Sequence, residues 1–481
     1  MPDEKQAYDL AVVGGGPAGY AAALRARELG AQVVLIEPQH VGGHCVHYSC
    51  IPSTIMLDSA RRALESQEMS LAGVLGDPGL PNFARAATRK SVLVHNLAQG
   101  IQALLKSRRI TVLDARASFE GPTELTAHLL DGGQESIEAK AVVLATGARY
   151  EPTDLPGIPA NDQLSPDEAL ALPEAPGSVC VIGGGPAALG FAWEYASLFA
   201  VFGERVILLE PPTETGASPL PSLDETILGL LQESLKQLGV EVHLGAQLTA
   251  AARTTTDGHD EWAIDFTSLP HNDGDDGLTS HSKTVGAVLR PDSRAPVVDV
   301  PGLAQLNLLG PDGYIAIDAG CATNAPGLYA AGDVTGPPLL SSVAEIQGRV
   351  AAENALGGDS RTDLTLIPHV LHSEPEVAAV GLTEAQARGE GYQVAIGLAN
   401  LAGNGRVAAL GRREGLVKLV ADGESGELLG VHIAAPFASE AIAQGVACLK
   451  LGATLTDVAS MVHWHPSVAE ALTQAARAAL R

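Results

Sequence analysis

Two segments of this chain share one pattern of apolar and polar positions. The first, YDLAVVGGGPAGYAAALRARELGAQVVLIE (residues 8–37), predicts a strand, a tight turn, a helix and a second strand. Gly14, Gly16 and Gly19 occupy the positions of a G-x-G-x-x-G fingerprint, and Glu37 follows eighteen residues after Gly19. Such glycines let a pyrophosphate approach the N-terminus of the helix, and the carboxylate can accept a hydrogen bond from a ribose hydroxyl. The segment therefore predicts a dinucleotide-binding unit rather than an ordinary glycine turn.

A second copy of the pattern, SVCVIGGGPAALGFAWEYASLFAVFGERVILLE, ends at Glu210. Gly183 and Gly185 keep the first two glycine positions, Ala188 replaces the third, and the helix is expected to be about one turn longer. A carboxylate at position 210 would repel a 2′-phosphate, so this unit is expected to prefer NAD over NADP. A structural relic that no longer binds a nucleotide is the alternative.

The remaining segments complete an α/β architecture. Residues 141–150 (AVVLATGARY) predict a buried strand that ends in a glycine turn, and residues 327–356 predict a strand, a Gly-Asp turn and a helix. Asp333 in that turn could bind polyol hydroxyls or could simply cap the turn. The polar stretch 250–284 predicts a β-meander with an exposed loop. Residues 364–481 alternate strands with apolar helices, among them 455–480, and their excess apolar surface indicates a subunit interface.

Length and charge narrow the class of protein. The 481 residues suggest about three domains, and 46% hydrophobic with 18% charged residues indicates a globular chain. A net charge of −26 argues against a nucleic-acid partner, which basic side chains would have to bind. The chain has no apolar run long enough for a membrane helix, and its polar N-terminus leads straight into a strand. We therefore expect a cytoplasmic protein without a membrane partner.

The segment GGHCVHYSCIPST (42–54) carries the candidate chemistry, because it holds two of the five cysteines, Cys45 and Cys50. Three histidines lie in or beside it: His40, His44 and His47. A redox pair, a metal site and two unrelated core thiols are the three readings of this segment. In a regular helix five residues rise about 7.5 Å, which exceeds the Cα separation of about 4.4–6.8 Å usual for a disulfide. A redox pair therefore requires a distorted segment, and a helix that follows Cys50 would favour its thiolate.

The motifs together resemble the class I pyridine nucleotide-disulfide oxidoreductases, the flavoprotein family of dihydrolipoamide dehydrogenase and glutathione reductase. The resemblance rests on the first fingerprint, C-x4-C followed by IPS, ATG, YAAGD, SEPEVAAVGLTE (373–384) and HWHPSVAE (463–470), and it spans nearly the whole chain. It implies an α/β fold with two Rossmann-like dinucleotide-binding domains and a C-terminal α+β dimerisation domain. The expected domains are an FAD-binding domain (1–150 and 285–355), an NAD-binding-like domain (151–284) and an interface domain (356–481).

The resemblance also implies roles for individual residues. FAD would bind the first fingerprint, with Glu37 on the adenosine ribose and Asp333 on the ribityl chain. Three further residues would line this nucleotide site: Gly43, Ala117 and Gly147. NAD would bind through Gly183, Gly185 and Glu210. Cys45 would exchange with substrate, and Cys50 would face the flavin as the charge-transfer thiol. His465 would be the general acid/base, supplied across a homodimer, and Glu470 would orient it.

The chain departs from the family pattern on the nicotinamide side of the flavin. The usual lysine after I-P-S is Thr54, and the glutamate that pairs with it is expected at position 190, which is glycine. Pro186 replaces an aromatic lid, and SRAP (293–296) replaces G-R-x-P. We therefore expect slow reduction by NADH and a weak charge-transfer band.

The main functional prediction is an FAD-dependent thiol-disulfide oxidoreductase close to dihydrolipoamide dehydrogenase. It would pass electrons between a small dithiol/disulfide or a lipoyl-carrying protein, the cysteine pair, FAD and NAD. The alternative is a flavoprotein with a decayed nicotinamide site that uses oxygen, a quinone or a protein partner.

Overall fold

The computed structural model describes residues 6–77, 79–151, 153–184, 190–212, 219–256, 258–269, 278–290 and 293–481. The chain divides into two units. Unit 1 comprises Met1–Ser53, Thr88–Glu151 and Arg294–Leu364, and unit 2 comprises Thr54–Ala87, Pro152–Ser293 and Thr365–Arg481. Residues 54–87, expected in the first domain, group with unit 2 because Met56 and Phe83 pack in one apolar cluster with Trp193 and Phe199.

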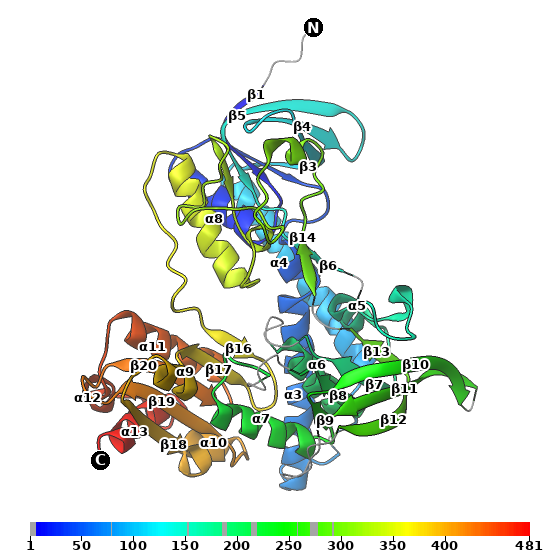
Figure 1. The fold of residues 1–481 in the computed structure, drawn as a ribbon, viewed down its shortest axis with the longest axis vertical. Helices are drawn as coiled ribbons and strands as arrows, with labels where there is room; N and C mark the ends of the chain where they lie inside the picture. The colour runs from blue at the N-terminus through cyan, green and yellow to red at the C-terminus, as the bar shows by residue number, and fades with distance from the viewer. Residues whose placement is uncertain are drawn as a thin grey trace. The chain divides into compact units, whose positions relative to one another are not determined.

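Unit 1 is built around a parallel sheet that the first fingerprint begins. Its core strands run in the order β3-β2-β1-β5-β15, and β4 pairs antiparallel with the outer parts of β3 and β5. The strands are β1 (Gln6–Val13), β2 (Val33–Glu37), β3 (Thr111–Phe119), β4 (Glu124–Leu129), β5 (Gln134–Leu144) and β15 (Leu328–Ala330) (Figure 1). The strand, turn, helix and strand predicted for residues 8–37 are therefore confirmed.

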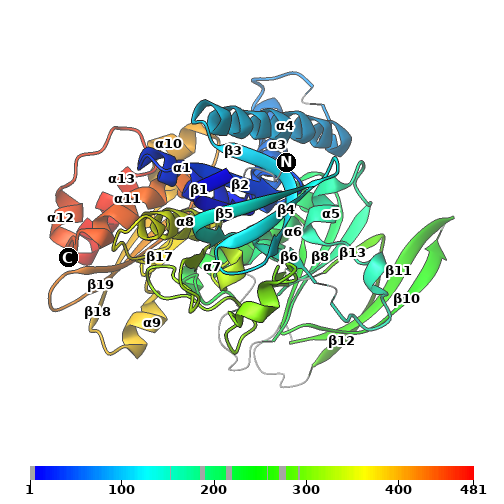
Figure 2. The ribbon, with the colours of Figure 1, turned by 90° about the horizontal axis from the view of Figure 1, so that it is seen from above.

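Helices α1 (Pro17–Glu28) and α8 (Ser341–Ala355) pack against each other beside this sheet (Figure 2). Their approach is close, because a Cβ added at Gly348 would lie 2.1 Å from the carbonyl oxygen of Ala18. The other elements that begin or lie in unit 1 are α2 (Gly43–His47), α3 (Cys50–Leu71), β6 (Ala148–Tyr150), β14 (Arg294–Pro296), η3 (Leu303–Leu306) and η4 (Asp333–Thr335). Helix α4 (Phe83–Ser107) begins in unit 2 and continues into unit 1.

The second fingerprint begins the other parallel sheet, which lies in unit 2 and has the order β13-β7-β8-β9. Its elements are β7 (Ser178–Ile182), α6 (Phe191–Val201), β8 (Arg205–Glu210), α7 (Glu225–Gln237), β9 (Glu241–Leu244) and β13 (Ala287–Leu289). The expected meander is confirmed as the antiparallel strands β10 (Gln247–Thr256), β11 (His259–Ser268) and β12 (Thr279–Val285). Short elements precede this region: η1 (Ala160–Asp162) and α5 (Pro166–Ala171). Gly185, Pro186 and Ala188 lie outside the described residues.

The C-terminal part of unit 2 is an antiparallel sheet of order β16-β17-β20-β19-β18. Its strands are β16 (His369–Leu371), β17 (Val377–Gly381), β18 (Val394–Asn400), β19 (Leu416–Asp422) and β20 (Leu428–Ala434). The accompanying helices are α9 (Glu384–Gly389), η5 (Leu401–Gly403), α10 (Gly405–Ala409), α11 (Ala438–Lys450), α12 (Leu455–Ser460) and α13 (Glu470–Ala479). The single helix expected over 455–480 is thus two helices, because Pro466 cannot continue a helix and disfavours helical backbone in the residue before it.

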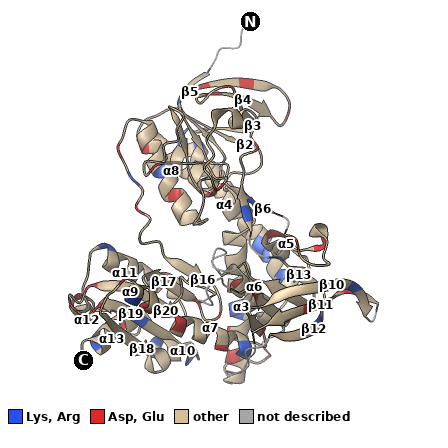
Figure 3. Ribbon diagram, viewed as in Figure 1, with Lys and Arg blue, Asp and Glu red and all other residues tan. Residues whose placement is uncertain are grey.

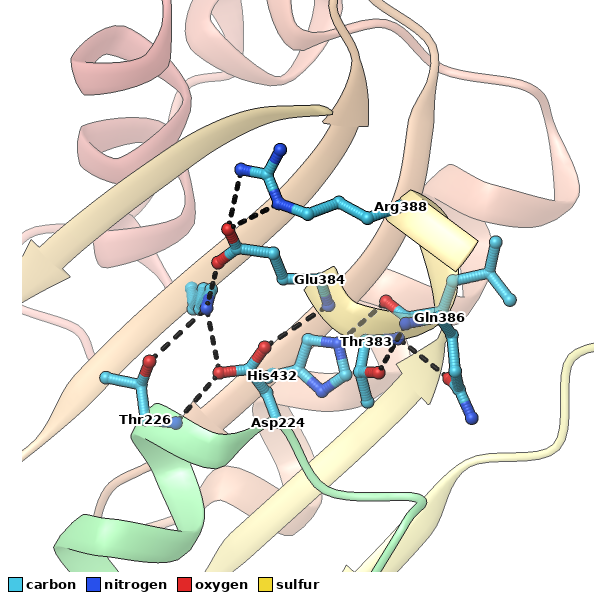
Figure 4. A network of polar contacts seen from close by, with 9 residues as sticks. Asp224, Thr226, Thr383, Glu384, Gln386, Arg388 and His432 are labelled. Atoms are coloured by element: carbon cyan, nitrogen blue, oxygen red, sulfur yellow. Dashed lines mark hydrogen bonds and ion pairs between the residues drawn. The ribbon is translucent and has the colours of Figure 1, made fainter. Parts of the chain in front are cut away.

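A buried polar network fixes α7 to the C-terminal sheet (Figure 4). Lys418 on β19 donates to Asp224 at 2.8 Å and to Glu384 at 2.7 Å. Asp224 is also the N-cap of α7, where its side chain accepts the N–H of Thr226 at 3.0 Å. Both acids therefore have a partner, which a buried charge requires.

Charged side chains are spread over many elements of both units (Figure 3). Among the described helices, none combines the length and the apolar character that crossing a membrane would need.

Candidate active site

The first fingerprint forms a tightly packed turn with room only for glycine. A Cβ added at Gly19 would lie 1.9 Å from the carbonyl oxygen of Gly14, and one added at Gly14 would lie 2.2 Å from that of Ala145. Gly16 is the N-cap of α1, so no side chain at that position shields the positive end of the helix. These features fit a bound pyrophosphate, as the pattern predicts.

Glu37 lies at the end of β2, against this turn. Its carboxylate accepts the backbone N–H of Gly15 at 2.6 Å and that of Gln39 at 2.8 Å. Two backbone bonds fix the side chain beside the fingerprint, where a nucleotide ribose would be expected.

The segment that carries the cysteines is anchored on the same turn. The N–H of Gly42 donates to the carbonyl oxygen of Gly15 at 2.8 Å. Gly43 has φ +58°, and a Cβ there would lie 2.5 Å from the Cα of Gly16. The fingerprint and the start of α2 are therefore in direct backbone contact, which places Gly43 beside the cradle as the resemblance implies.

The helix is interrupted between the two cysteines. Helix α2 ends at His47, Tyr48 leaves helical backbone with φ −128°, and α3 begins at Cys50. The carbonyl of His44 accepts the N–H groups of Tyr48 at 2.9 Å and Ser49 at 3.0 Å, which closes the turn. This is the distortion that a redox pair requires, and Cys50 starts the helix that was expected to follow it. Both cysteines are present as thiols, Cys45 half-buried and Cys50 exposed.

The surroundings make the two thiols unequal. A hydrogen bond from Cys45 lowers the pKa of Cys50 to about 6, with further help from two serine hydroxyls and the charge of His44. The oxygens of Ser49 and Ser341 lie 3.7 Å and 3.8 Å from the Cys50 sulfur. The same bond, together with burial, raises the pKa of Cys45. The pair thus favours a thiolate at Cys50 and a thiol at Cys45. The contribution of Ser341, far away in sequence, was not predicted.

Asp333 lies at the start of η4, directly after β15, and is paired with Arg294. The guanidinium of Arg294 donates to the Asp333 carboxylate at 3.0 Å and lies 5.9 Å from the ring centre of Tyr150. Burial raises the pKa of Asp333, although Arg294 and His44 oppose this. Arg294 is the arginine of SRAP, so the reduced motif keeps the guanidinium next to Asp333.

The two other residues implied for the flavin site lie in the same unit. Ala117 is buried in β3 and pairs with Ala127. Gly147 precedes β6, and its carbonyl accepts the N–H of Val297 at 2.9 Å.

The expected acid/base dyad is assembled in unit 2. Nδ1 of His465 lies 2.9 Å from a carboxylate oxygen of Glu470. The histidine side chain is 77% exposed and the glutamate 15%, so the imidazole projects outward from a fixed carboxylate. Asn404 donates to Glu470 at 3.2 Å and to the carbonyl of Ser467 at 2.9 Å. Asn404 was not predicted, because its contacts cross more than sixty positions of sequence.

The second fingerprint keeps its glycine and acid in contact. A Cβ at Gly183 would lie 2.2 Å from Glu210, whose buried carboxylate also accepts the indole N–H of Trp193 at 2.8 Å. Glu210 thus reaches the turn of its own fingerprint, as Glu37 does in unit 1.

The expected loss of a glutamate from the helix of this fingerprint is corrected by the structure. Gly190 precedes α6 in left-handed backbone, with φ +76°, so it is not the helical position that was compared. The first turn of α6 carries the buried Glu194 instead, which accepts the N–H of His372 at 3.0 Å. Only the lysine position, Thr54, lacks the charged residue.

The metal-site alternative finds no support in the described residues. They contain no group of three or more His, Cys, Asp or Glu side chains that could hold a metal ion. His40 and His47 instead pack ring against ring, 5.2 Å apart.

Comparison with known proteins places the chain. The family model for pyridine nucleotide-disulphide oxidoreductases matches residues 8–348, and the model for their dimerisation domain matches residues 367–476. Dihydrolipoyl dehydrogenase from Halobacterium salinarum is 34% identical over 477 residues, covering 98% of this chain and 96% of that protein. The enzyme of the same name from Thermus scotoductus is 34% identical over 474 residues, covering 98% and 97%. The chain belongs to the pyridine nucleotide-disulphide oxidoreductase family.

Solved structures agree with this assignment. LpdA from Mycobacterium tuberculosis is 26% identical with a TM-score of 0.82, covering 97% of this chain and 99% of that one. A Cu(II) complex of the flavoprotein disulfide reductase RclA from Escherichia coli has the same fold, with a TM-score of 0.83 at 24% identity. Within the family, the chain is an FAD-dependent disulfide oxidoreductase that resembles dihydrolipoyl dehydrogenase, and its cofactors are FAD and NAD(H). The predicted class and fold are confirmed, the dimerisation domain supports the predicted homodimer, and the nicotinamide-free alternative is not favoured.

Proposed function

We propose that this enzyme oxidises a small dithiol, or the dihydrolipoyl group of a carrier protein, with Cys45 and Cys50 as its redox pair. The observation that carries the proposal is the unequal thiol pair at the interrupted helix, with Cys50 at the N-terminus of α3. FAD, when bound, supplies the two-electron acceptor between this pair and NAD⁺. We expect the reaction to take place in the cytoplasm.

The cysteine chemistry follows from the two pKa values. One sulfur of the substrate, as a thiolate, attacks Cys45 of the oxidised pair, a substrate–Cys45 disulfide forms, and Cys50 leaves as a thiolate. A low pKa makes Cys50 the better leaving group, since the leaving thiol controls the rate of exchange. The second substrate sulfur then attacks the first, the substrate disulfide forms, and Cys45 leaves with a proton. The substrate has lost two electrons and two protons.

His465 moves the protons in this scheme. It accepts a proton from each attacking substrate thiol and returns one to Cys45. The carboxylate of Glu470 at 2.9 Å stabilises the imidazolium and fixes the proton at Nδ1, which leaves Nε2 for the substrate. We infer that the partner subunit's His465 serves each cysteine pair, because the histidine projects outward from its own chain.

Substitutions test these roles. Cys45→Ser and Cys50→Ser are expected to abolish oxidation of dihydrolipoamide by NAD⁺ while FAD stays bound. His465→Ala is expected to slow the reaction by about 10²–10⁴-fold, the usual effect of losing a positioned acid/base group. Cys448→Ala, at a buried thiol of α11, serves as the control that should keep activity. Unchanged turnover in any of the first three variants would show that the assigned residue does not take part.

A further inference from the structure

His44 is fixed beside the cysteine pair by its backbone and by its ring. Its carbonyl closes the turn between the cysteines by accepting two N–H groups, at 2.9 Å and 3.0 Å. Its ring lies edge-on to Tyr150 with centres 5.4 Å apart, and its centre is 6.1 Å from that of Tyr48. A residue held at both ends keeps its imidazole at a defined place in the redox loop.

The charges around the pair are of both signs. The groups whose charges reach Cys45 or Cys50, or that pair with such a group, are His44, Tyr20 on α1, Asp333 on η4, Glu345 on α8 and Arg294 on β14. Burial raises the pKa of Tyr20 to about 12, so this phenol stays neutral. Asp333 disfavours a thiolate nearby, and Arg294 is bonded to that carboxylate at 3.0 Å.

Electrostatic support for the thiolate therefore falls to His44. A positive charge on its imidazole lowers the pKa of Cys50 and that of Asp333. Helix α3 adds its positive end at Cys50. The position where the family resemblance leads one to expect a lysine, Thr54, carries no charge.

We propose that His44 is a positioning residue of the redox loop, whose imidazolium stabilises the thiolate of Cys50 when the disulfide opens. The inference deepens the proposed function and rests on it. Because an imidazole titrates between about pH 5 and pH 8, this stabilisation fades as the pH rises, which a lysine in the same role would not show.

The test measures the thiolate of Cys50 directly in the FAD-loaded protein. In a Cys45→Ser background, which keeps a hydroxyl donor at position 45, the rate of alkylation of Cys50 by iodoacetamide is followed by peptide mass spectrometry from about pH 5 to about pH 9. His44→Gln should shift the midpoint upward, so that alkylation near pH 6 is about three- to tenfold slower, since opposite charges at close range favour the ionised form. At the highest pH, where both thiols are ionised, the two rates should agree.

Two matched variants separate charge from shape. His44→Lys should restore a low midpoint, because it returns a positive charge to the same place. His47→Gln, which removes the imidazole that contacts the Val41 carbonyl at 3.0 Å, should leave the midpoint unchanged. An unchanged midpoint in His44→Gln, an equal loss of rate at every pH, or no recovery with lysine would each overturn the inference. If Cys50 shows no reactive thiolate even with His44 present, the proposed function itself fails instead.

Discussion

Gly19→Ala is expected to weaken FAD binding, because the new methyl group has no space. Its Cβ would lie 1.9 Å from the carbonyl oxygen of Gly14, and an ordinary contact needs at least 3.4 Å, so about 1.5 Å of separation must be created. Both sides of the contact are backbone, hence α1 must move away from the turn that is to cradle the pyrophosphate. Overpacking of this kind costs about 1–3 kcal/mol. If the cost falls on the cradle, the Kd for FAD rises about 5- to 150-fold.

The assay is reconstitution of the apoprotein with FAD, followed by flavin fluorescence, alongside urea unfolding of the apoprotein. Gly100→Ala is the matched control within unit 1, since Gly100 lies in α4 and its added Cβ meets no atom within 4 Å. The control should keep its Kd and gain up to about 1 kcal/mol in free energy of unfolding, the helix preference of alanine over glycine. A Kd for Gly19→Ala within twofold of the wild type would refute the reasoning that this contact shapes the FAD site.

Three further outcomes are expected. Thr54→Lys should speed flavin reduction by NADH and strengthen the long-wavelength charge-transfer band in stopped-flow absorbance, and Glu194→Gln in the same background should reduce the gain; a fast wild type whose band lysine does not increase would contradict this. Glu470→Gln should slow dithiol oxidation by about tenfold or more and alter its pH profile while leaving the alkylation of Cys50 unchanged, because the carboxylate at 2.9 Å orients and charges only His465. Hydrogen bonds and charge from His372, Arg61 and Ser439 outweigh burial and hold the pKa of Glu376 at about 2, below its ordinary 4.5, so the stability it provides is present above about pH 4.5 and is lost as the pH falls towards 2. Glu376→Gln should therefore lower the free energy of unfolding at pH 7 by about 3 kcal/mol and flatten its acid dependence in urea titrations, and an unchanged acid dependence would show that another group carries it.

Much of the fold was readable from the sequence because it depends on local signals. Glycine spacing fixed the two fingerprints, since Gly19 and Gly183 stand where backbone or carboxylate atoms leave no room for a Cβ. Apolar strands ending at Glu37 and Glu210 identified the acids that reach these turns. Sequence distance alone also required a break between Cys45 and Cys50, which the structure shows at Tyr48. The residue types at His465 and Glu470 sufficed to propose a dyad.

Counting along the sequence failed where local backbone departs from a regular element. The glutamate of the second fingerprint was sought at Gly190, but left-handed backbone there starts α6 one residue later, and the buried acid is Glu194. The helix expected over 455–480 is broken before Pro466. Neither feature has a signature in apolar periodicity, which records burial and not the conformation of single residues.

Only the tertiary structure decided which distant groups act on the site. Ser341 approaches Cys50, Arg294 pairs with Asp333, and Asn404 bonds Glu470, each across tens to hundreds of positions. Hydrogen bonds and desolvation act over a few ångströms, so the inequality of the two thiols depends on side chains that the fold brings together from separate strands and helices. The sequence by itself determined the family, the cofactor fingerprints and the identity of the cysteine pair. The polarity of that pair, with the thiolate at Cys50, follows from three-dimensional neighbours that no local pattern records.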